Sequence, residues 1–138
     1  MINKLTIEAV ELLKKLIATQ SFSGEENETA LLIMQWFSHH NIQFESDKHN
    51  VWAKNKHFDP SKKTILLNSH HDTVKPNRGY TRNPLSPAIE NGKLYGLGSN
   101  DAGGCLVSLL ATFTYFYNRD NLKYNFVIVA SAEEENSG

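Results

Sequence analysis

Histidine and acidic side chains gather at three points of the sequence, each beside an apolar run or a glycine-rich stretch. His70, His71 and Asp72 follow "TILLNS", Asp101 lies within "GLGSNDAGG", and three glutamates at 133–135 follow "YNFVIVASA". Carboxylates that share a crevice repel one another unless a cation lies between them. Imidazole and carboxylate ligands together suit zinc, manganese or cobalt better than calcium, which prefers oxygen ligands alone. The residue types therefore predict a divalent metal site, if the fold brings the three clusters together.

The spacing within two clusters predicts separate tasks for neighbouring residues. In His70-x-Asp72 both side chains of an extended chain point to the same side. Asp72 can therefore accept a hydrogen bond from the ring nitrogen of His70 that faces away from a metal. Glu134 and Glu135 are adjacent and point in different directions, so one can bind metal while the other acts as a base toward the attacking water. His71 points away from His70 and is not predicted to be a ligand.

Each cluster taken alone has a simpler explanation. Polar residues after a strand are common, Asp101 suits the N-cap of a helix, and "EEEN" is usually a solvated turn. The glycines around Asp101 suggest a nucleotide-binding loop, but their spacing differs from G-x-G-x-x-G and Asp101 would repel a pyrophosphate. A non-catalytic interaction domain with a degenerate site is a third alternative, and the intact Glu134 and Glu135 argue against it. Placement of all three clusters at one sheet edge favours the metal site.

Other candidate residues carry weaker signals. The glycines beside Asp101 are expected to let the backbone approach the site closely. Ser99 and Ser131 lack the context of an activated nucleophile, and Cys105 is expected in the core. The remaining histidines stand in surface-like contexts: His39, His40, His49 and His57.

The elements that must position these residues alternate between helix and strand. Apolar residues at helical spacing predict a first helix over 6–18, with Ile7, Val10, Leu13 and Ile17 on its buried face. A second helix is predicted over 25–40, with an apolar stripe and a capping box formed by Ser23 and Glu26. Strands are predicted at 42–45, 50–54, 64–70 and 124–131, a hairpin turn at Asn91-Gly92, and a third helix over 102–117.

Strand 64–70, helix 102–117 and strand 124–131 form a predicted βαβ unit. Its two strands should be parallel, and strand 64–70 reads as buried on both faces. The carboxyl ends of both strands then lie at one edge of the sheet, where ligands bind in open α/β folds. All three polar clusters are expected at that edge. A strand of this kind usually continues into another helix, so we expect the chain to be the N-terminal part of a larger catalytic domain.

Composition narrows the classes of partner. The 138 residues carry 14 basic and 15 acidic side chains, a net charge of -1, which gives no reason to expect nucleic acid as a partner. No apolar run approaches the roughly 20 residues that cross a bilayer, so no membrane is expected. One cysteine fits a reducing compartment. We expect a cytoplasmic protein.

The motifs together resemble metallopeptidase family M20, the co-catalytic zinc hydrolases. The resemblance rests on "SHHDTV" at 69–74, "YTRNP" at 80–84, "GLGSNDAGG" at 96–104 and "ASAEEENSG" at 130–138. It implies an α/β, three-layer zinc-peptidase-like domain with a mixed, largely parallel sheet. It also implies two divalent metal ions, zinc first and cobalt or manganese as alternatives. By position, His70 would bind one metal, Asp72 would orient it, Asp101 would bridge both, Glu134 would be the general base and Glu135 would bind the second metal.

The resemblance also implies what this chain lacks. The family places a cis peptide after the bridging aspartate, here Asp101-Ala102, and takes one further carboxylate and one histidine from beyond residue 138. A lid domain, through which the full-length protein would form a homodimer, is expected there too. Alone, this chain is therefore expected to be inactive. This sequence departs from residues common in the family at Leu85, Ala102 and Gly103. These differences are expected to affect packing and subfamily more than the chemistry of the site.

Within the family, "SHHDTVKPNRGYTRNP" is most similar to the acetylornithine deacetylase branch. That branch implies deacylation of N-acetylornithine, or of a related N-acyl ornithine or citrulline, in arginine biosynthesis. Succinyl-diaminopimelate desuccinylase and the di- and carboxypeptidases of the family are the alternatives.

Overall fold

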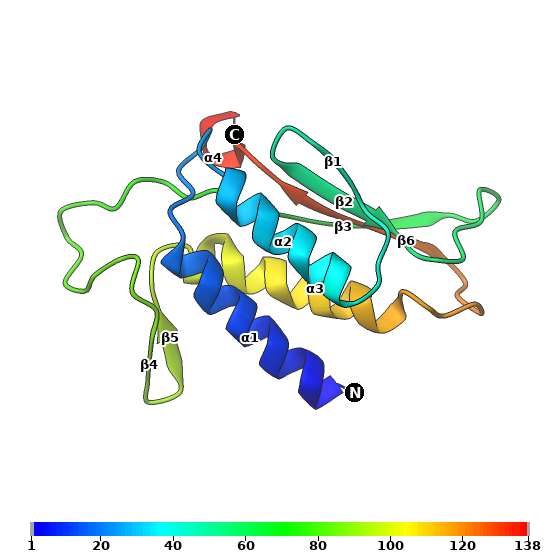
Figure 1. The fold of residues 1–138 in the computed structure, drawn as a ribbon, viewed down its shortest axis with the longest axis horizontal. Helices are drawn as coiled ribbons and strands as arrows, with labels where there is room; N and C mark the ends of the chain where they lie inside the picture. Colours follow the sequence, from blue (N-terminus) through cyan, green and yellow to red (C-terminus); the bar gives the residue numbers. More distant parts are fainter. Residues whose placement is uncertain (1, 138) are drawn as a thin grey trace.

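The structure, a computed structural model, describes residues 2–137. Helices, strands and one irregular turn (η1) follow one another in the order α1 (Ile2–Ala18), α2 (Asn27–His39), β1 (Glu45–Asp47), β2 (Asn50–Lys54), β3 (Thr64–His70), β4 (Ala88–Glu90), β5 (Lys93–Tyr95), η1 (Ser99–Gly103), α3 (Gly104–Phe116), β6 (Asn125–Ser131) and α4 (Glu134–Ser137). α2 and α3 pack against the sheet, and α1 packs against these two helices (Figure 1). The predicted α/β class is confirmed.

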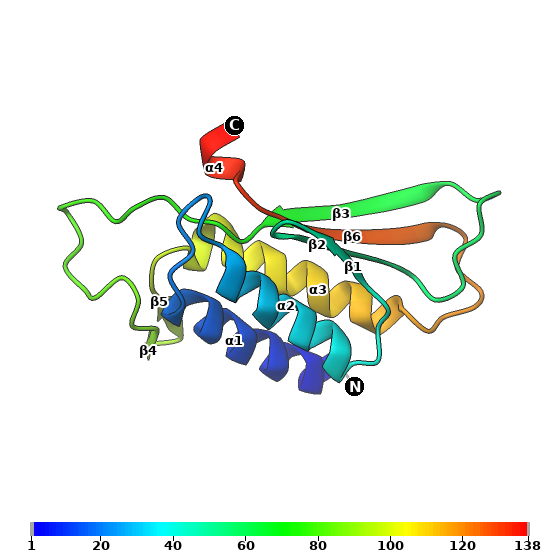
Figure 2. The same ribbon diagram turned by 45° about the horizontal axis from the view of Figure 1, so that its top comes forward.

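The main sheet is mixed and has the strand order β1-β2-β6-β3. β3 and β6 run parallel, from Thr64 opposite Asn125 to His70 opposite Ser131, while β2 runs antiparallel to β6. The predicted parallel pairing is therefore confirmed. Because the two parallel strands end side by side, the residues that follow them emerge at one edge of the sheet, next to α4 (Figure 2).

The core lies between the sheet and the three helices, and it corrects the face predicted for the first helix. The α1 side chains that are buried are Leu5, Ala9, Leu12, Leu13, Leu16 and Ile17. Ile7, predicted on that face, is 65% exposed. α1 packs against both α2 and α3, so its buried stripe is centred between those two contacts and leaves Ile7 outside.

β3 is not buried on both faces as predicted. It is an edge strand of the sheet that the described residues form, and Leu66 is 61% exposed. The three long helices cover the opposite face of the sheet, as Figure 2 shows. Continuous apolar sequence indicates burial only where both faces are covered, and here one face is open.

Two local predictions about helix starts are also wrong. Cys105 is exposed, because α3 buries Leu106, Val107, Leu110 and Phe113 and turns the preceding residue outward. Ser23 and Glu26 form no capping box, since α2 begins at Asn27 and its N-cap residue Glu26 makes no side-chain capping bond.

The predicted hairpin turn is confirmed at Asn91-Gly92, between β4 and β5. Both turn residues have positive φ angles, 50° and 74°, as the two-residue hairpin turn requires.

The glycine-rich stretch around Asp101 is closely packed at Gly103. A Cβ atom added to Gly103 would lie 2.7 Å from Gly98 O and 2.7 Å from Leu13 Cδ1. Because neither neighbour belongs to a flexible surface side chain, this turn has no room for a methyl group.

We therefore expect Gly103→Ala to lower the free energy of unfolding by about 1–3 kcal/mol, the usual effect of overpacking. Cys105→Ala, two residues further on and exposed, is the matched control and should change stability by less than about 0.5 kcal/mol. Urea denaturation of both variants measures the difference. Equal stability of the two variants would show that the turn can shift without loss.

Among residues 2–137, no helix combines the length and the hydrophobicity that crossing a membrane requires.

Candidate metal centre

His70 occupies the last position of β3 and is held by the residue two places further on. Its Nδ1 lies 3.1 Å from the carbonyl oxygen of Asp72 and 3.2 Å from Asp72 Oδ1. Both partners are acceptors, so Nδ1 carries a proton, and Nε2 is the ring nitrogen that faces the other acidic residues. With Nδ1 protonated and held in this way, a histidine binds a metal through Nε2 when Nε2 gives up its proton to the ion. The predicted contact between His70 and Asp72 is present.

Asp101 reaches the same point from the turn before α3. Its Oδ1 lies 3.1 Å from His70 Nε2, although 31 residues separate the two in sequence. The Asp101-Ala102 peptide is cis, as the resemblance implied. The side chain of Asp101 is 77% exposed, so packing does not explain its approach to His70.

Glu134 and Glu135 form the first turn of α4, directly after β6. Glu134 Oε2 lies 3.8 Å from His70 Nε2. Ligand atoms of His70, Glu134 and Glu135 all lie within 4.8 Å of one another. Among the described residues, these three side chains form the group of metal-binding residue types that is close enough to hold one ion. The three clusters that follow β3, precede α3 and follow β6 therefore meet at one edge of the sheet.

The charges at this edge favour a cation. Burial raises the pKa of Glu135, and the neighbouring carboxylates of Asp101, Glu134 and Asp72 raise it further. Burial alone would lower the pKa of His70, but contacts with Asp101, Asp72 and Glu134 outweigh burial and raise it. Glu135, whose ionisation the neighbouring negative charges oppose, and the other acidic side chains around it are groups whose charges a divalent cation would balance. The donor set fits such an ion.

Asp72 is fully buried, yet it remains a carboxylate. Burial would raise its pKa, but hydrogen bonds from Ser23, from the backbone of Glu135 and Glu134, and the nearby His70 lower the pKa below its usual value. The Ser23 hydroxyl donates to Oδ2 over 2.7 Å. Asp72 thus joins the end of β3 to the start of α4.

Sequence reasoning missed a second buried group that adjoins this edge. Glu26 is 0% exposed, and His71 is also buried. His49, which the sequence placed in a surface context, donates from Nδ1 to Glu26 Oε2 over 2.9 Å. Local sequence gave no signal for this contact, because the partners are 23 residues apart and Glu26 resembled half of a capping box.

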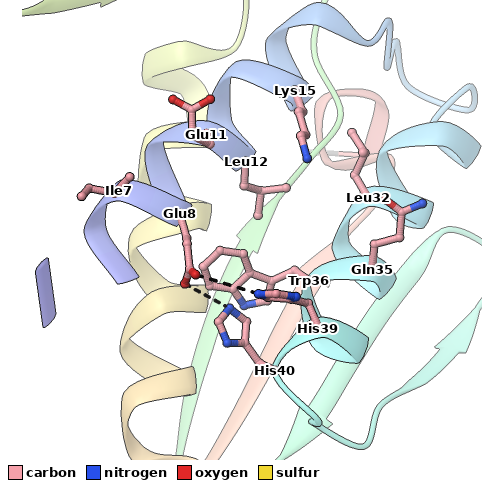
Figure 3. A pocket seen from close by; sticks show the side chains of 10 residues that line it. All are labelled: Ile7, Glu8, Glu11, Leu12, Lys15, Leu32, Gln35, Trp36, His39 and His40. Atoms are coloured by element: carbon pink, nitrogen blue, oxygen red, sulfur yellow. Dashed lines mark ion pairs between the residues drawn. The ribbon is translucent and has the colours of Figure 1, made fainter. Parts of the chain in front are cut away.

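A different titratable cluster lies between α1 and α2. There Glu8 faces His40 and His39, with Nε2 to carboxylate distances of 3.6 and 3.9 Å, beside Trp36 (Figure 3). His40 is largely buried and so does not match its predicted surface context, and burial lowers its pKa. Within residues 2–137, the group whose ligand atoms are close enough to hold a metal does not include Glu8, His39 or His40. We therefore interpret this cluster as a contact between the two helices.

Comparison with known proteins agrees with the motifs and the fold. The profile of peptidase family M20/M25/M40 matches residues 66–138. Acetylornithine deacetylase of Shigella sonnei is 32% identical over 147 residues, covering 93% of this chain and 36% of that protein. The LysW-lysine/LysW-ornithine hydrolase of Sulfurisphaera tokodaii is 31% identical over 128 residues, covering 93% of this chain and 33% of that protein.

Solved structures share the fold. Human carnosine dipeptidase 1 superposes with a TM-score of 0.76 at 21% identity, covering 97% of this chain and 33% of that one. The chain thus spans about a third of the length of the curated relatives it matches. With the profile matched over more than half of the chain and the fold shared over nearly all of it, this chain belongs to peptidase family M20.

Proposed function

We propose that this chain contributes the general base and part of a two-metal site to a hydrolase that cleaves the amide bond of a small N-acyl amino acid. One observation carries the proposal: His70, Glu134 and Glu135 present ligand atoms within 4.8 Å of one another, with Asp101 Oδ1 3.1 Å from His70 Nε2. Four groups from three separate segments have no packing reason to converge at a sheet edge.

His70, Asp101 and Glu135 would hold the metal ions, zinc first and cobalt or manganese as alternatives. When bound, such ions act as Lewis acids on the amide carbonyl and lower the pKa of water. Asp72 keeps His70 in the tautomer that leaves Nε2 available, through the contacts of 3.1 and 3.2 Å at Nδ1. The assignment of Asp101 as the bridging ligand follows the family motif.

Glu134 would do the proton transfer. Attack on an amide requires a proton to leave the attacking water and a proton to reach the departing amine, and one carboxylate can serve both steps. Glu134 lies beside His70 and is 53% exposed, so its carboxylate is open to water and substrate. The family motif gives the neighbouring Glu135 to the metal.

The substrate we propose is N-acetylornithine, or a related N-acyl ornithine or citrulline, within arginine biosynthesis. Two relatives at 31–32% identity are named for ornithine derivatives, which supports this choice. N-succinyl-diaminopimelate and small peptides are the alternatives. A cytoplasmic location and a homodimer, formed through segments outside this chain, belong to the same proposal.

The test uses the complete gene product, because the chain spans about a third of its relatives. We expect amide hydrolysis of N-acetylornithine to fall at least about 100-fold after dialysis against a chelator, and to return when Zn²⁺ or Co²⁺ is added. N-acetylcitrulline, N-succinyl-diaminopimelate and carnosine, assayed in parallel, decide among the substrates. Hydrolysis that survives complete metal removal, or none with any of the four compounds, would contradict the proposal.

A further inference from the structure

Four consecutive backbone N–H groups, at residues 132–135, are each bound by a side-chain oxygen from another part of the chain. Asn50 Oδ1 accepts the first at 3.0 Å, and Glu26 Oε1 accepts the second at 2.9 Å. Asp72 Oδ1 and Oδ2 accept the third and fourth at 3.2 and 3.1 Å. The segment that presents Glu134 and Glu135 is therefore fixed residue by residue through its backbone.

Glu26 is the unexpected member of this set. Its carboxylate is 0% exposed, and it caps no N–H of its own helix α2. Oε1 accepts from Gly24 N at 3.0 Å as well as from Glu133 N, and Oε2 accepts from His49 Nδ1 at 2.9 Å. A buried carboxylate is tolerated only when donors of this kind satisfy it, so both oxygens of Glu26 are held in place.

A second set of contacts holds His49 in turn. His71 Nε2 lies 2.9 Å from the carbonyl oxygen of His49, which can only accept, so Nε2 carries the proton. His71 Nδ1 lies 2.9 Å from the hydroxyl of Thr29, in the first turn of α2. Glu26 is thereby tied to the turn between β1 and β2, to the residue after β3 and to its own helix.

We propose that Glu26 is a positioning residue for the glutamate pair: its buried carboxylate fixes the backbone at Glu133 and so sets where Glu134 and Glu135 point. The backbone there is unusual, since Glu133 has a φ of 58°, a left-handed conformation that few residues other than glycine adopt. The bond from Glu133 N to Glu26 Oε1 holds the chain at that reversal. The kinetic consequence rests on the proposed hydrolase function, whereas the anchoring does not.

Two substitutions at Glu26 separate positioning from filling space. Glu26→Leu keeps the size but accepts no hydrogen bond. Glu26→Gln keeps a carbonyl oxygen for Gly24 N and Glu133 N, and its amide can donate to His49 Nδ1 in the other tautomer. In the complete gene product we expect kcat to fall about 10–100-fold in Glu26→Leu, as for other groups that orient catalytic ligands. KM should change less than about 3-fold, and Glu26→Gln should stay within about 3-fold of the wild type in both constants.

Hydrogen exchange tests the anchoring of the backbone without any measurement of enzyme activity. Peptides covering 130–137 should exchange at least about 10-fold faster in Glu26→Leu than in Glu26→Gln or the wild type, while peptides from α3 (104–116) stay unchanged. Faster exchange throughout the protein would show a general packing role and overturn the proposal, as would equal kcat losses in the two variants. An inactive wild type that shows the exchange pattern would reject the hydrolase function and keep the anchoring.

His49→Ala keeps the proposal testable if Glu26→Leu fails to fold, because the side chain of His49 is 28% exposed and less embedded. We expect a smaller loss of kcat, and local faster exchange in the same peptides. Unchanged exchange at 130–137 in His49→Ala would overturn the proposal.

Discussion

Replacing Glu134 by glutamine in the complete gene product is expected to lower kcat by roughly 10²–10⁴-fold, the usual contribution of general acid–base catalysis. Glutamine keeps the shape of the side chain but cannot take a proton from the attacking water. Because Glu134 is assigned to proton transfer and not to the metal, both metal ions and a near-normal KM should remain. Metal analysis and steady-state kinetics on the same preparation measure both quantities.

The neighbouring glutamate provides the contrast. Glu135→Gln should lower the metal content, and with it the activity. Glu28→Gln removes an exposed carboxylate on α2 and should leave metal content and kcat unchanged. If Glu134→Gln turned over near the wild-type rate, or lost a metal ion, the roles of Glu134 and Glu135 would have to be exchanged.

The parts of the fold that the sequence predicts correctly are those specified by local patterns. Apolar runs with turn signals predict β3 and β6, and Asn91-Gly92 predicts the β4–β5 hairpin. Parallel pairing follows from the helix between the two strands. Once the strands are parallel, the convergence of His70, Asp101 and the glutamate pair follows from their places at strand ends and at a helix start.

The wrong predictions concern contacts between residues that are far apart in sequence. Glu26 matches a capping box locally, but its carboxylate bonds to Glu133 N, 107 residues away, and that partner outweighs the local one. The sequence around His49 is typical of a surface position, and its contact with Glu26 is formed only in the folded chain. The burial of β3 and of Cys105 depends on which faces are covered, and periodicity does not carry that information.

Asp101→Asn should separate metal binding from folding, because the two effects have opposite signs. In the metal-free protein, the carboxylate of Asp101 faces other acids and contributes to the raised pKa of Glu135. Its side chain is 77% exposed, so its replacement leaves no cavity. Removing the charge relieves this repulsion, and the contact with His70 that is also lost is open to solvent and contributes little. The melting temperature of the metal-free protein should therefore stay the same or rise, as is common at functional sites.

The affinity of Asp101→Asn for metal, in contrast, should fall. Loss of a group that orients a ligand already lowers affinity about 10–100-fold, so loss of the proposed bridging carboxylate should lower zinc affinity at least about 100-fold. Competition with a chelator of known affinity measures this in the complete gene product, and calorimetry of the metal-free form measures the melting temperature. Asp120→Asn, at an exposed position, is the control. If Asp101→Asn kept its zinc affinity while melting earlier, Asp101 would be a structural residue, and its approach to His70 would have to be explained by the folding of the turn before α3.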